Sequence, residues 1–279
     1  MQIGVCVHHN ANKTREAFKK MTESGFSCCQ LVSWNPTLWT DEEASHIRAA
    51  AEEFGVTITA FWCGYTGPVI WNFYEGQETL GLVPAAYRHQ RMNEILAGAS
   101  FAQKLGVKDV VTHVGYLPEN PYDENFAGVV VCIRHIADKL KEAGQNFLFE
   151  TGQETPVTLL RTIEEIGRDN VFINLDTANL ILYGKGNPVD ALDVFGKYVK
   201  GVHCKDGKFP TNGKDLGEEV PIGEGKADLC TVIKKLHALS YPGTLTIERE
   251  IEGAQQDVDI LNAYKLLTSY IKKAEEDAE

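Results

Sequence analysis

The 279-residue sequence lacks several features that would each assign a chain to a particular class of protein. It contains no apolar run approaching the ~20 residues that cross a bilayer, and its start has neither the basic region nor the apolar core of a secretion signal. Its 7 cysteines are odd in number and include no C-x-x-C pair, which argues against a disulfide framework or a redox motif. We therefore expect a reduced, cytoplasmic protein with no membrane partner.

An excess of basic residues is also missing, because 27 Lys and Arg face 39 Asp and Glu and give a net charge of −12. Holding nucleic acid through its phosphates requires a basic surface, so we expect no nucleic-acid partner. No G-x-G-x-x-G motif follows the first expected strand, which leaves a dinucleotide-binding Rossmann fold without support. No linker or low-complexity segment divides the chain, and a single domain over residues 1–279 is expected.

What the sequence does contain is a regular alternation of short β-branched apolar runs with amphipathic stretches. The apolar runs span residues 3–7, 28–33, 56–63, 109–115, 146–151, 171–176, 199–206 and 243–250. Strands that alternate with helices form parallel sheets, and eight such units in a chain of this length predict an α/β fold, the closed (β/α)8 TIM barrel. Two long loops, 64–84 and 207–228, follow the third and seventh strands, where the loops of a barrel carry its active site.

Four consecutive expected strands end in residue types that bind metals: Glu150, Asp176, His203 and Glu248. The carboxyl ends of barrel strands meet at one mouth, so these side chains can converge. Three carboxylates brought together there would repel one another unless a cation held them. Three carboxylates with one imidazole suit Mn²⁺, Mg²⁺ or Co²⁺ better than Zn²⁺. The strand ends therefore predict one divalent metal ion with positions left open for substrate oxygens.

Five motifs surround these strand ends, at residues 150–155 (ETGQET), 175–179 (LDTAN), 203–206 (HCKD), 221–228 (PIGEGKAD) and 246–250 (TIERE). Together they resemble the xylose isomerase-like superfamily and, within it, the sugar phosphate isomerase/epimerase family, to which ketohexose 3-epimerases belong. The resemblance implies a TIM barrel with one divalent metal held by the four strand-end residues. It also implies that Glu150 and Glu248 form the catalytic acid/base pair.

The chain departs from the epimerase pattern at two places. Asn179 stands where those enzymes typically carry a histidine three residues after the aspartate, and no arginine is evident after His-x-Lys-Asp, where Lys208 is only a loose substitute. These departures weaken an assignment to the epimerases in particular, while the metal-ligand pattern is intact.

A metal at this mouth would polarise a sugar carbonyl and stabilise the enediolate that forms when a base removes the α-proton. If one glutamate removes that proton and the other returns one to the opposite face, the carbon is inverted. Transfer on one face would instead interconvert aldose and ketose. We therefore expect a metal-dependent sugar isomerase or epimerase with a small-molecule sugar substrate. A sugar phosphate remains open, but a non-phosphorylated sugar is favoured: no glycine-rich phosphate loop stands out after the seventh and eighth strands, and the glutamate of Gly223-Glu224-Gly225 disfavours an anion.

Further residues near the strand ends are candidate substrate ligands, namely His8, Trp62, His113, Glu154, Asn179, Lys205 and Arg249. Strand alternation places Lys205 on the same face as His203, whereas Arg249 can reach the mouth only if its strand has already ended. Trp62, together with Trp34 and Trp71, could form an apolar wall against a sugar ring.

Three other functions remain open at this point. A lyase of the inosose dehydratase kind would use the same scaffold and expel water from the carbanion. A nuclease like endonuclease IV shares the barrel but needs more clustered histidines and a basic surface. A sugar-binding barrel without catalysis is the third alternative, and assembly into homo-oligomers is also left open.

Overall fold

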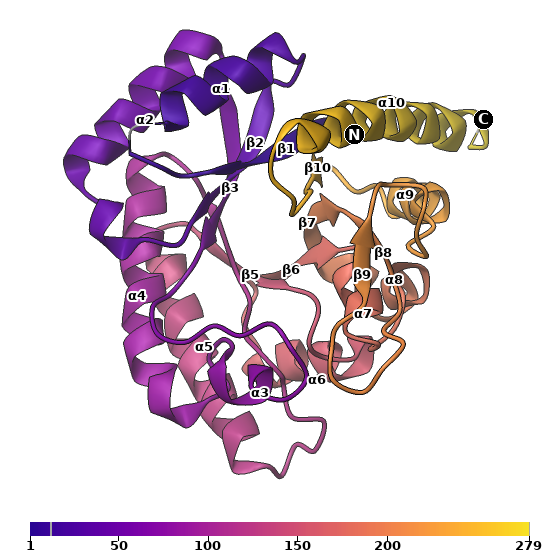
Figure 1. Ribbon diagram of the computed structural model, residues 1–279. Coiled ribbons are helices and arrows are strands. Elements are labelled where there is room, and N and C mark those ends of the chain that lie inside the picture. The colour runs from indigo at the N-terminus through magenta and orange to yellow at the C-terminus, as the bar shows by residue number, and fades with distance from the viewer. Residues whose placement is uncertain (12, 279) are drawn as a thin grey trace.

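Eight parallel strands close into a barrel in the computed structural model, which describes residues 1–11 and 13–278 (Figure 1). Around the ring they are β1 (Gln2–His8), β2 (Cys28–Ser33), β3 (Thr57–Cys63), β4 (Asp109–Thr112), β5 (Asn146–Glu150), β6 (Val171–Asp176), β7 (Val199–Cys204) and β10 (Thr244–Ile247). The ring closes where β10 pairs with β1, for example Leu245 beside Ile3. The predicted (β/α)8 barrel is confirmed.

An outer layer of helices surrounds the strands (Figure 1). Its main members are α1 (Thr14–Glu23), α2 (Asp41–Phe54), α4 (Ala85–Lys104), α5 (Glu124–Glu142), α6 (Pro156–Ile166), α8 (Pro188–Phe195), α9 (Leu229–Ala238) and α10 (Ala254–Glu276). Helix α5 illustrates their construction. The side chain of Asp123 caps its first turn by accepting a hydrogen bond from the Asn125 amide, and Val130 and Ile133 lie on its buried face. Such an apolar stripe drives a helix onto the sheet.

The apolar core has two parts. The larger one fills the space between the helices and the barrel, and the smaller one, Val32, Ala60, Trp62, Val111 and Leu148, lies inside the barrel. Burying one large apolar side chain contributes ~1.5–3 kcal/mol, so both parts stabilise the fold. Because the barrel is packed with side chains, a ligand can enter only at an end.

Three strands end two or more residues earlier than the sequence predicts, at Thr112, Cys204 and Ile247, and β5 ends one residue earlier, at Glu150. After Thr112 and Cys204 the chain leaves the barrel for other partners. The Val114 carbonyl accepts a hydrogen bond of 2.7 Å from the Leu82 amide, and the residues after Cys204 form an antiparallel hairpin of β8 (Asp206–Lys208) and β9 (Glu218–Val220). Alternation along a strand therefore does not fix the direction of the side chains after Ile247.

Both long loops follow strand carboxyl ends and meet above the barrel. The loop after β3 contains the short helix α3 (Gly76–Thr79), and the loop after β7 contains the β8–β9 hairpin. The Phe73 amide of the first donates to the Lys214 carbonyl of the second at 3.4 Å. Gly64 is required at the start of the first loop, because a Cβ there would lie 2.6 Å from the Trp34 ring.

Within the described residues, no helix is both long and apolar enough to cross a membrane.

Candidate functional site

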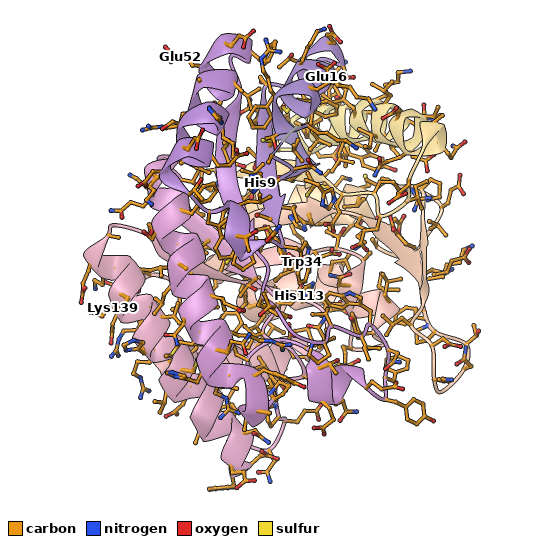
Figure 2. All side chains as sticks on the ribbon, turned by 60° about the vertical axis from the view of Figure 1, so that its left-hand side comes forward. His9, Glu16, Trp34, Glu52, His113 and Lys139 are labelled. Carbon is orange, nitrogen blue, oxygen red and sulfur yellow. The ribbon has the colours of Figure 1, made fainter. Side chains whose placement is uncertain are left out.

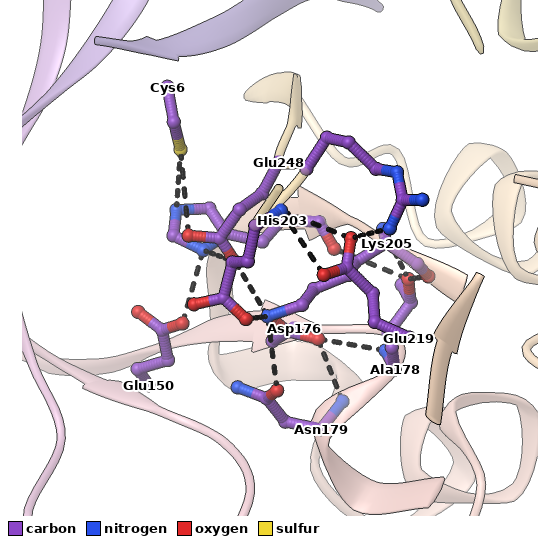
Figure 3. Close-up of polar contacts among 12 residues, drawn as sticks. Cys6, Glu150, Asp176, Ala178, Asn179, His203, Lys205, Glu219 and Glu248 are labelled. Atoms are coloured by element: carbon purple, nitrogen blue, oxygen red, sulfur yellow. Dashed lines mark hydrogen bonds and ion pairs between the residues drawn. The ribbon is translucent and has the colours of Figure 1, made fainter. Parts of the chain in front are cut away.

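The four metal-ligand residues predicted from the strand ends lie together at the carboxyl end of the barrel (Figure 3). Glu150 and Asp176 are the last residues of β5 and β6, His203 is next to last in β7, and Glu248 follows β10 directly. One donor atom from each of the four lies within 4.8 Å of the others. Carboxylate oxygens with one imidazole nitrogen form a donor set that suits a hard divalent cation.

Asp176 offers a free oxygen to this cluster. Its Oδ1 accepts hydrogen bonds of 2.8 Å from the amides of Ala178 and Asn179, whereas its Oδ2 is buried without a hydrogen-bond partner. Burial raises the pKa of Asp176 well above its usual range, and the charge of Lys205 opposes this rise only in part. A cation bound to Oδ2 would satisfy this oxygen, so the residues present fit a divalent metal.

A chain of buried amides fixes the orientation of His203. Its Nε2 lies 2.9 Å from Oε1 of Gln30, whose amide nitrogen in turn donates to Oδ1 of Asn174 at 2.9 Å. With the proton on Nε2, Nδ1 faces Oε1 of Glu150 at 3.1 Å and Oε2 of Glu248 at 3.4 Å. Although burial lowers the pKa of His203, the surrounding acidic groups hold it well above its usual value.

The site keeps both glutamates of the cluster ionised, although Glu150 is buried and Glu248 is half-buried. Glu150 accepts a hydrogen bond from Trp62 Nε1, and its Oε1 lies 3.7 Å from His113 Nε2. Burial alone would raise the pKa of both carboxyls. The neighbouring histidines His203 and His113 outweigh burial at Glu150 and lower its pKa below the usual value. Lys205 and His203 lower the pKa of Glu248 well below its usual value. Both can therefore accept a proton at neutral pH.

Lys205 is a buried cation beside the cluster, with only 2% of its surface exposed. Its Nζ donates to Glu250, to Glu248 at 3.2 Å and to Asn179 at 3.4 Å, and it lies 3.6 Å from Oδ2 of Asp176. Burial lowers the pKa of Lys205, but these carboxylates outweigh burial and raise it well above its usual value. The ammonium group therefore stays charged and partly offsets the acidic cluster.

A cavity of about 240 Å³, which we call the mouth, opens above these groups. Its lining residues are His8, Val32, Trp34, Trp62, Trp71, His113, Glu150, Asn179, Leu182, Tyr183, Lys205, Leu216, Glu248 and Glu250. Aromatic rings form one wall, with centroids 4.8 Å apart for Trp34 and Trp62 and 5.2 Å apart for Trp71 and His113. Figure 2 shows Trp34 and His113 near one another, whereas Lys139 projects from an outer helix. Such a wall can cover one face of a sugar ring.

Two predicted substrate ligands are not brought to the mouth. The strand does end before Arg249, but its guanidinium is held by Glu219 at 2.9 Å and Asp259 at 2.8 Å. Glu154 is buried to one side, where its Oε1 accepts a hydrogen bond of 3.4 Å from the Gly152 amide and burial raises its pKa to about 7. His8, Trp62, His113, Asn179 and Lys205 do line the mouth.

Among the site residues that sequence reasoning missed, three lie beside the acidic cluster or Lys205. Glu250 lies two residues after Glu248 and binds Lys205, and Gln30 orients His203. Cys6 lies in β1, and its Sγ is 3.7 Å from His203 Nε2. A polar residue within the apolar run of β2 was a visible signal for Gln30. The position of Cys6 two residues before His8 indicated that the two share a face of their strand.

The segment Gly223-Glu224-Gly225 is occupied by the protein itself. The amides of Gly223 and Gly225 both donate to Oδ2 of Asp206 at 3.0 Å. Oδ1 of Asp206 accepts from Gly207 at 2.8 Å and Ala227 at 2.9 Å. This loop therefore has an internal anion in place of a phosphate.

Solved structures share this barrel over nearly the whole chain. A xylose isomerase domain protein from Planctomyces limnophilus is 30% identical, with a TM-score of 0.89 and 98% of each chain covered. D-psicose 3-epimerase in the presence of D-fructose is 18% identical, with a TM-score of 0.72 and coverage of 97% of this chain and 99% of that one. A xylose isomerase-like protein from Mycobacterium smegmatis in complex with magnesium is 15% identical, with a TM-score of 0.70 and coverage of 94% and 90%. The last two likenesses show the fold alone.

Curated relatives match more distantly. An uncharacterised protein of Methanocaldococcus jannaschii is 30% identical over 178 residues, or 58% of either chain. A provisionally named L-ribulose-5-phosphate 3-epimerase of Escherichia coli K12 is 31% identical over 102 residues, 36% of this chain and 35% of that one. A provisionally named endonuclease 4 of Persephonella marina is 23% identical over 248 residues, 80% of this chain and 82% of that one. The first two matches thus span 58% and 35% of those relatives.

A family model gives the assignment that these individual matches do not. The model described as xylose isomerase-like TIM barrel matches residues 18–265, and this range contains all four residues of the acidic cluster. The chain therefore belongs to the xylose isomerase-like TIM barrel family.

Proposed function

We propose that the protein is a divalent-metal-dependent isomerase or epimerase of a non-phosphorylated sugar, with Glu150 and Glu248 as its proton-transfer pair. The observation that carries this proposal is the convergence of donor atoms from Glu150, Asp176, His203 and Glu248 within 4.8 Å of one another, beneath an aromatic-walled cavity. The resemblance to sugar epimerases in fold, and to a provisionally named pentulose phosphate 3-epimerase over part of the chain, supports it.

A divalent cation held by these four residues would supply a Lewis acid that polarises the substrate carbonyl and favours loss of the neighbouring proton. The chain's own residues do the remaining work. Trp62 donates to Glu150 and Lys205 donates to Glu248, so each carboxylate is held in one orientation. One glutamate takes the α-proton, and the other, after taking up a proton from solvent, returns a proton to the carbon. Proton return to the opposite face gives the epimer.

Charge at the mouth supports a substrate without phosphate. The basic side chain that is most buried there, Lys205, already pairs with Glu248 and Glu250. The Gly223–Gly225 amides are occupied by Asp206. A phosphate would therefore meet carboxylates instead of free donors, whereas sugar hydroxyls can donate to carboxylates. The same acidic mouth and the net charge of −12 oppose a DNA backbone, which a nuclease would have to bind.

The test is deuterium exchange from D₂O into D-fructose, D-tagatose and D-psicose with Mn²⁺, Mg²⁺ or Co²⁺, followed by NMR. We expect metal-dependent deuterium at C3 for an epimerase and at C1 or C2 for an aldose–ketose isomerase. Glu248→Gln should slow exchange by about 10²–10⁴-fold, because it removes one proton carrier. The exposed Glu252→Gln, four residues away, is the matched control and should keep the rate.

Two results would contradict the proposal. Full exchange in Glu248→Gln would remove the role given to that residue, and absence of exchange into every ketose tested would remove the reaction. Exchange accompanied by loss of water would identify the lyase alternative instead.

A further inference from the structure

A second cavity of about 480 Å³ lies beside the mouth and has about twice its volume. It is lined by residues of the loops after β3, β4, β5 and β6, among them Phe73, Tyr116, Glu119, Gln153, Tyr183 and Lys185. These loops all belong to the carboxyl end of the barrel, so the cavity opens on the same side as the acidic cluster. We call it the side chamber.

Tyr183 lies where the two cavities adjoin, since it lines both of them. Its ring packs edge-on against Tyr116 at 5.8 Å and against Phe73 at 6.5 Å. Gly152 permits this wall, because a Cβ there would come within 3.4 Å of the Tyr183 ring and 3.1 Å of Asn179. The loop after β3 covers both cavities, contributing Trp71 to the mouth and Phe73 to the side chamber. The two cavities therefore adjoin beneath one loop.

Gln153 lines the side chamber and is 1% exposed, yet neither its amide nitrogen nor its amide oxygen has a hydrogen-bond partner. Gln153 lies near Tyr183: burial raises the pKa of Tyr183, and the Gln153 side chain opposes this rise. A buried amide without partners costs stability, so such a group is expected where a ligand satisfies it. A hydroxyl group can both donate to and accept from an amide.

The charges of the side chamber point to a neutral ligand. Glu78, Glu119 and Asp123 line it together with a single lysine, Lys185, so an anion such as phosphate would be repelled. Carboxylates, an amide and aromatic faces are the groups that bind the hydroxyls and the apolar face of a carbohydrate.

We propose that the side chamber binds a second, neutral sugar unit, so that the substrate is a glycosylated sugar whose reacting end occupies the mouth. Gln153 and Lys185 would hold hydroxyls of the distal unit, and Tyr116 and Tyr183 would pack against it. This inference rests on the proposed function for the reacting end of the substrate. It adds the substrate class that the mouth alone, about 240 Å³ in volume, does not specify.

Calorimetry on the Mn²⁺-loaded protein tests the proposal with D-fructose and with glucosylfructoses joined through C4, C5 or C6 of fructose. At least one disaccharide should bind about tenfold more tightly than D-fructose, and Gln153→Leu should lower the ratio of disaccharide to monosaccharide affinity by about fivefold. Lys185→Met should lower the same ratio, and it provides a second variant at a half-buried position.

Thermal unfolding separates a ligand-binding glutamine from a structural one. Gln153→Leu should not lower Tm, because it removes an amide without partners. The matched control is Gln145→Leu. Gln145 is 3% exposed and donates to the carbonyls of Ala99 and Val107 at 3.0 Å, so its loss should lower Tm by about 5 °C.

The proposal is overturned if no glucosylfructose binds more tightly than D-fructose, or if both variants leave the affinity ratio unchanged. These binding results do not depend on turnover. Failure of deuterium exchange alongside a retained disaccharide preference would therefore contradict the reaction and leave the side chamber as a sugar site.

Discussion

Glu154 is a carboxylic acid that the fold holds away from water beside the candidate site, with 4% of its surface exposed. Burial raises its pKa from 4.5 to about 7, against weaker opposing hydrogen bonds from nearby backbone amides. In the unfolded chain the carboxyl ionises near pH 4.5, whereas in the folded chain it keeps its proton until about pH 7. The free energy of unfolding therefore falls as the pH rises between these values, by about 3 kcal/mol in total.

Glu154→Gln should remove this loss, because glutamine has no proton to release. The free energy of unfolding of the variant relative to the wild type should rise by about 3 kcal/mol between pH 4.5 and pH 7 and then level off. Denaturant unfolding at a series of pH values measures this difference. Glu164→Gln, at an exposed position of α6, is the control and should show a difference that does not vary with pH. A flat difference for Glu154→Gln would show that the carboxyl is not desolvated.

The residues that could be predicted from the sequence are those whose direction a strand decides. Glu150 and Asp176 end apolar runs, and the rule that barrel strands present their carboxyl ends to one mouth was sufficient to bring them together. Arg249 could not be placed in this way, because its partners Glu219 and Asp259 come from a hairpin and a helix that pack beside it only in the folded chain. Glu154 lies in a loop, where no periodicity fixes a side chain.

At the scale of elements, Asp206 organises the loop that carries the chain from β9 to α9. Its carboxylate accepts hydrogen bonds from the amides of Gly207, Gly223, Gly225 and Ala227. Gly225 must be glycine, since a Cβ there would lie 2.1 Å from Oδ1 of Asp206. The sequence predicted a strand through residue 206, but the hairpin to which Asp206 belongs depends on these distant amides, and no local pattern revealed them.

Asp206→Asn should destabilise the protein by about 2–4 kcal/mol, because an amide cannot accept hydrogen bonds from all of these donors. Hydrogen exchange should increase at the amides of Gly223, Gly225 and Ala227, while the strands of the barrel stay protected. Asp215→Asn, at an exposed position between β8 and β9, should change neither quantity. Unchanged exchange at those three amides in Asp206→Asn would show that the carboxylate does not hold the loop.

At the scale of the whole molecule, the alternation of eight apolar runs with amphipathic stretches was enough to predict the barrel. The packing of helices on strands follows directly from that pattern. The side chamber could not be predicted, because it lies between four loops that have no periodicity in common.

The barrel brings the acidic cluster to one end, where repulsion among its carboxylates affects the free energy of unfolding of the whole protein. The carboxylates of Glu150, Asp176 and Glu248 lie within 4.8 Å of one another, and the basic side chains beside them are His113, His203 and Lys205.

A divalent cation should therefore stabilise the folded protein against heat, because the unfolded chain does not hold these carboxylates together. At a concentration 100 times its Kd, a ligand of the folded state adds about 2.7 kcal/mol, which corresponds to a rise in Tm of about 5–10 °C. Asp176→Asn should abolish the Mn²⁺-dependent rise in Tm without lowering the Tm measured in EDTA, since it removes the oxygen that lacks a hydrogen-bond partner. Asp169→Asn, whose side chain is 73% exposed, should retain the full rise. A rise that persists in Asp176→Asn would place the cation elsewhere, and the proposed metal centre would then be wrong.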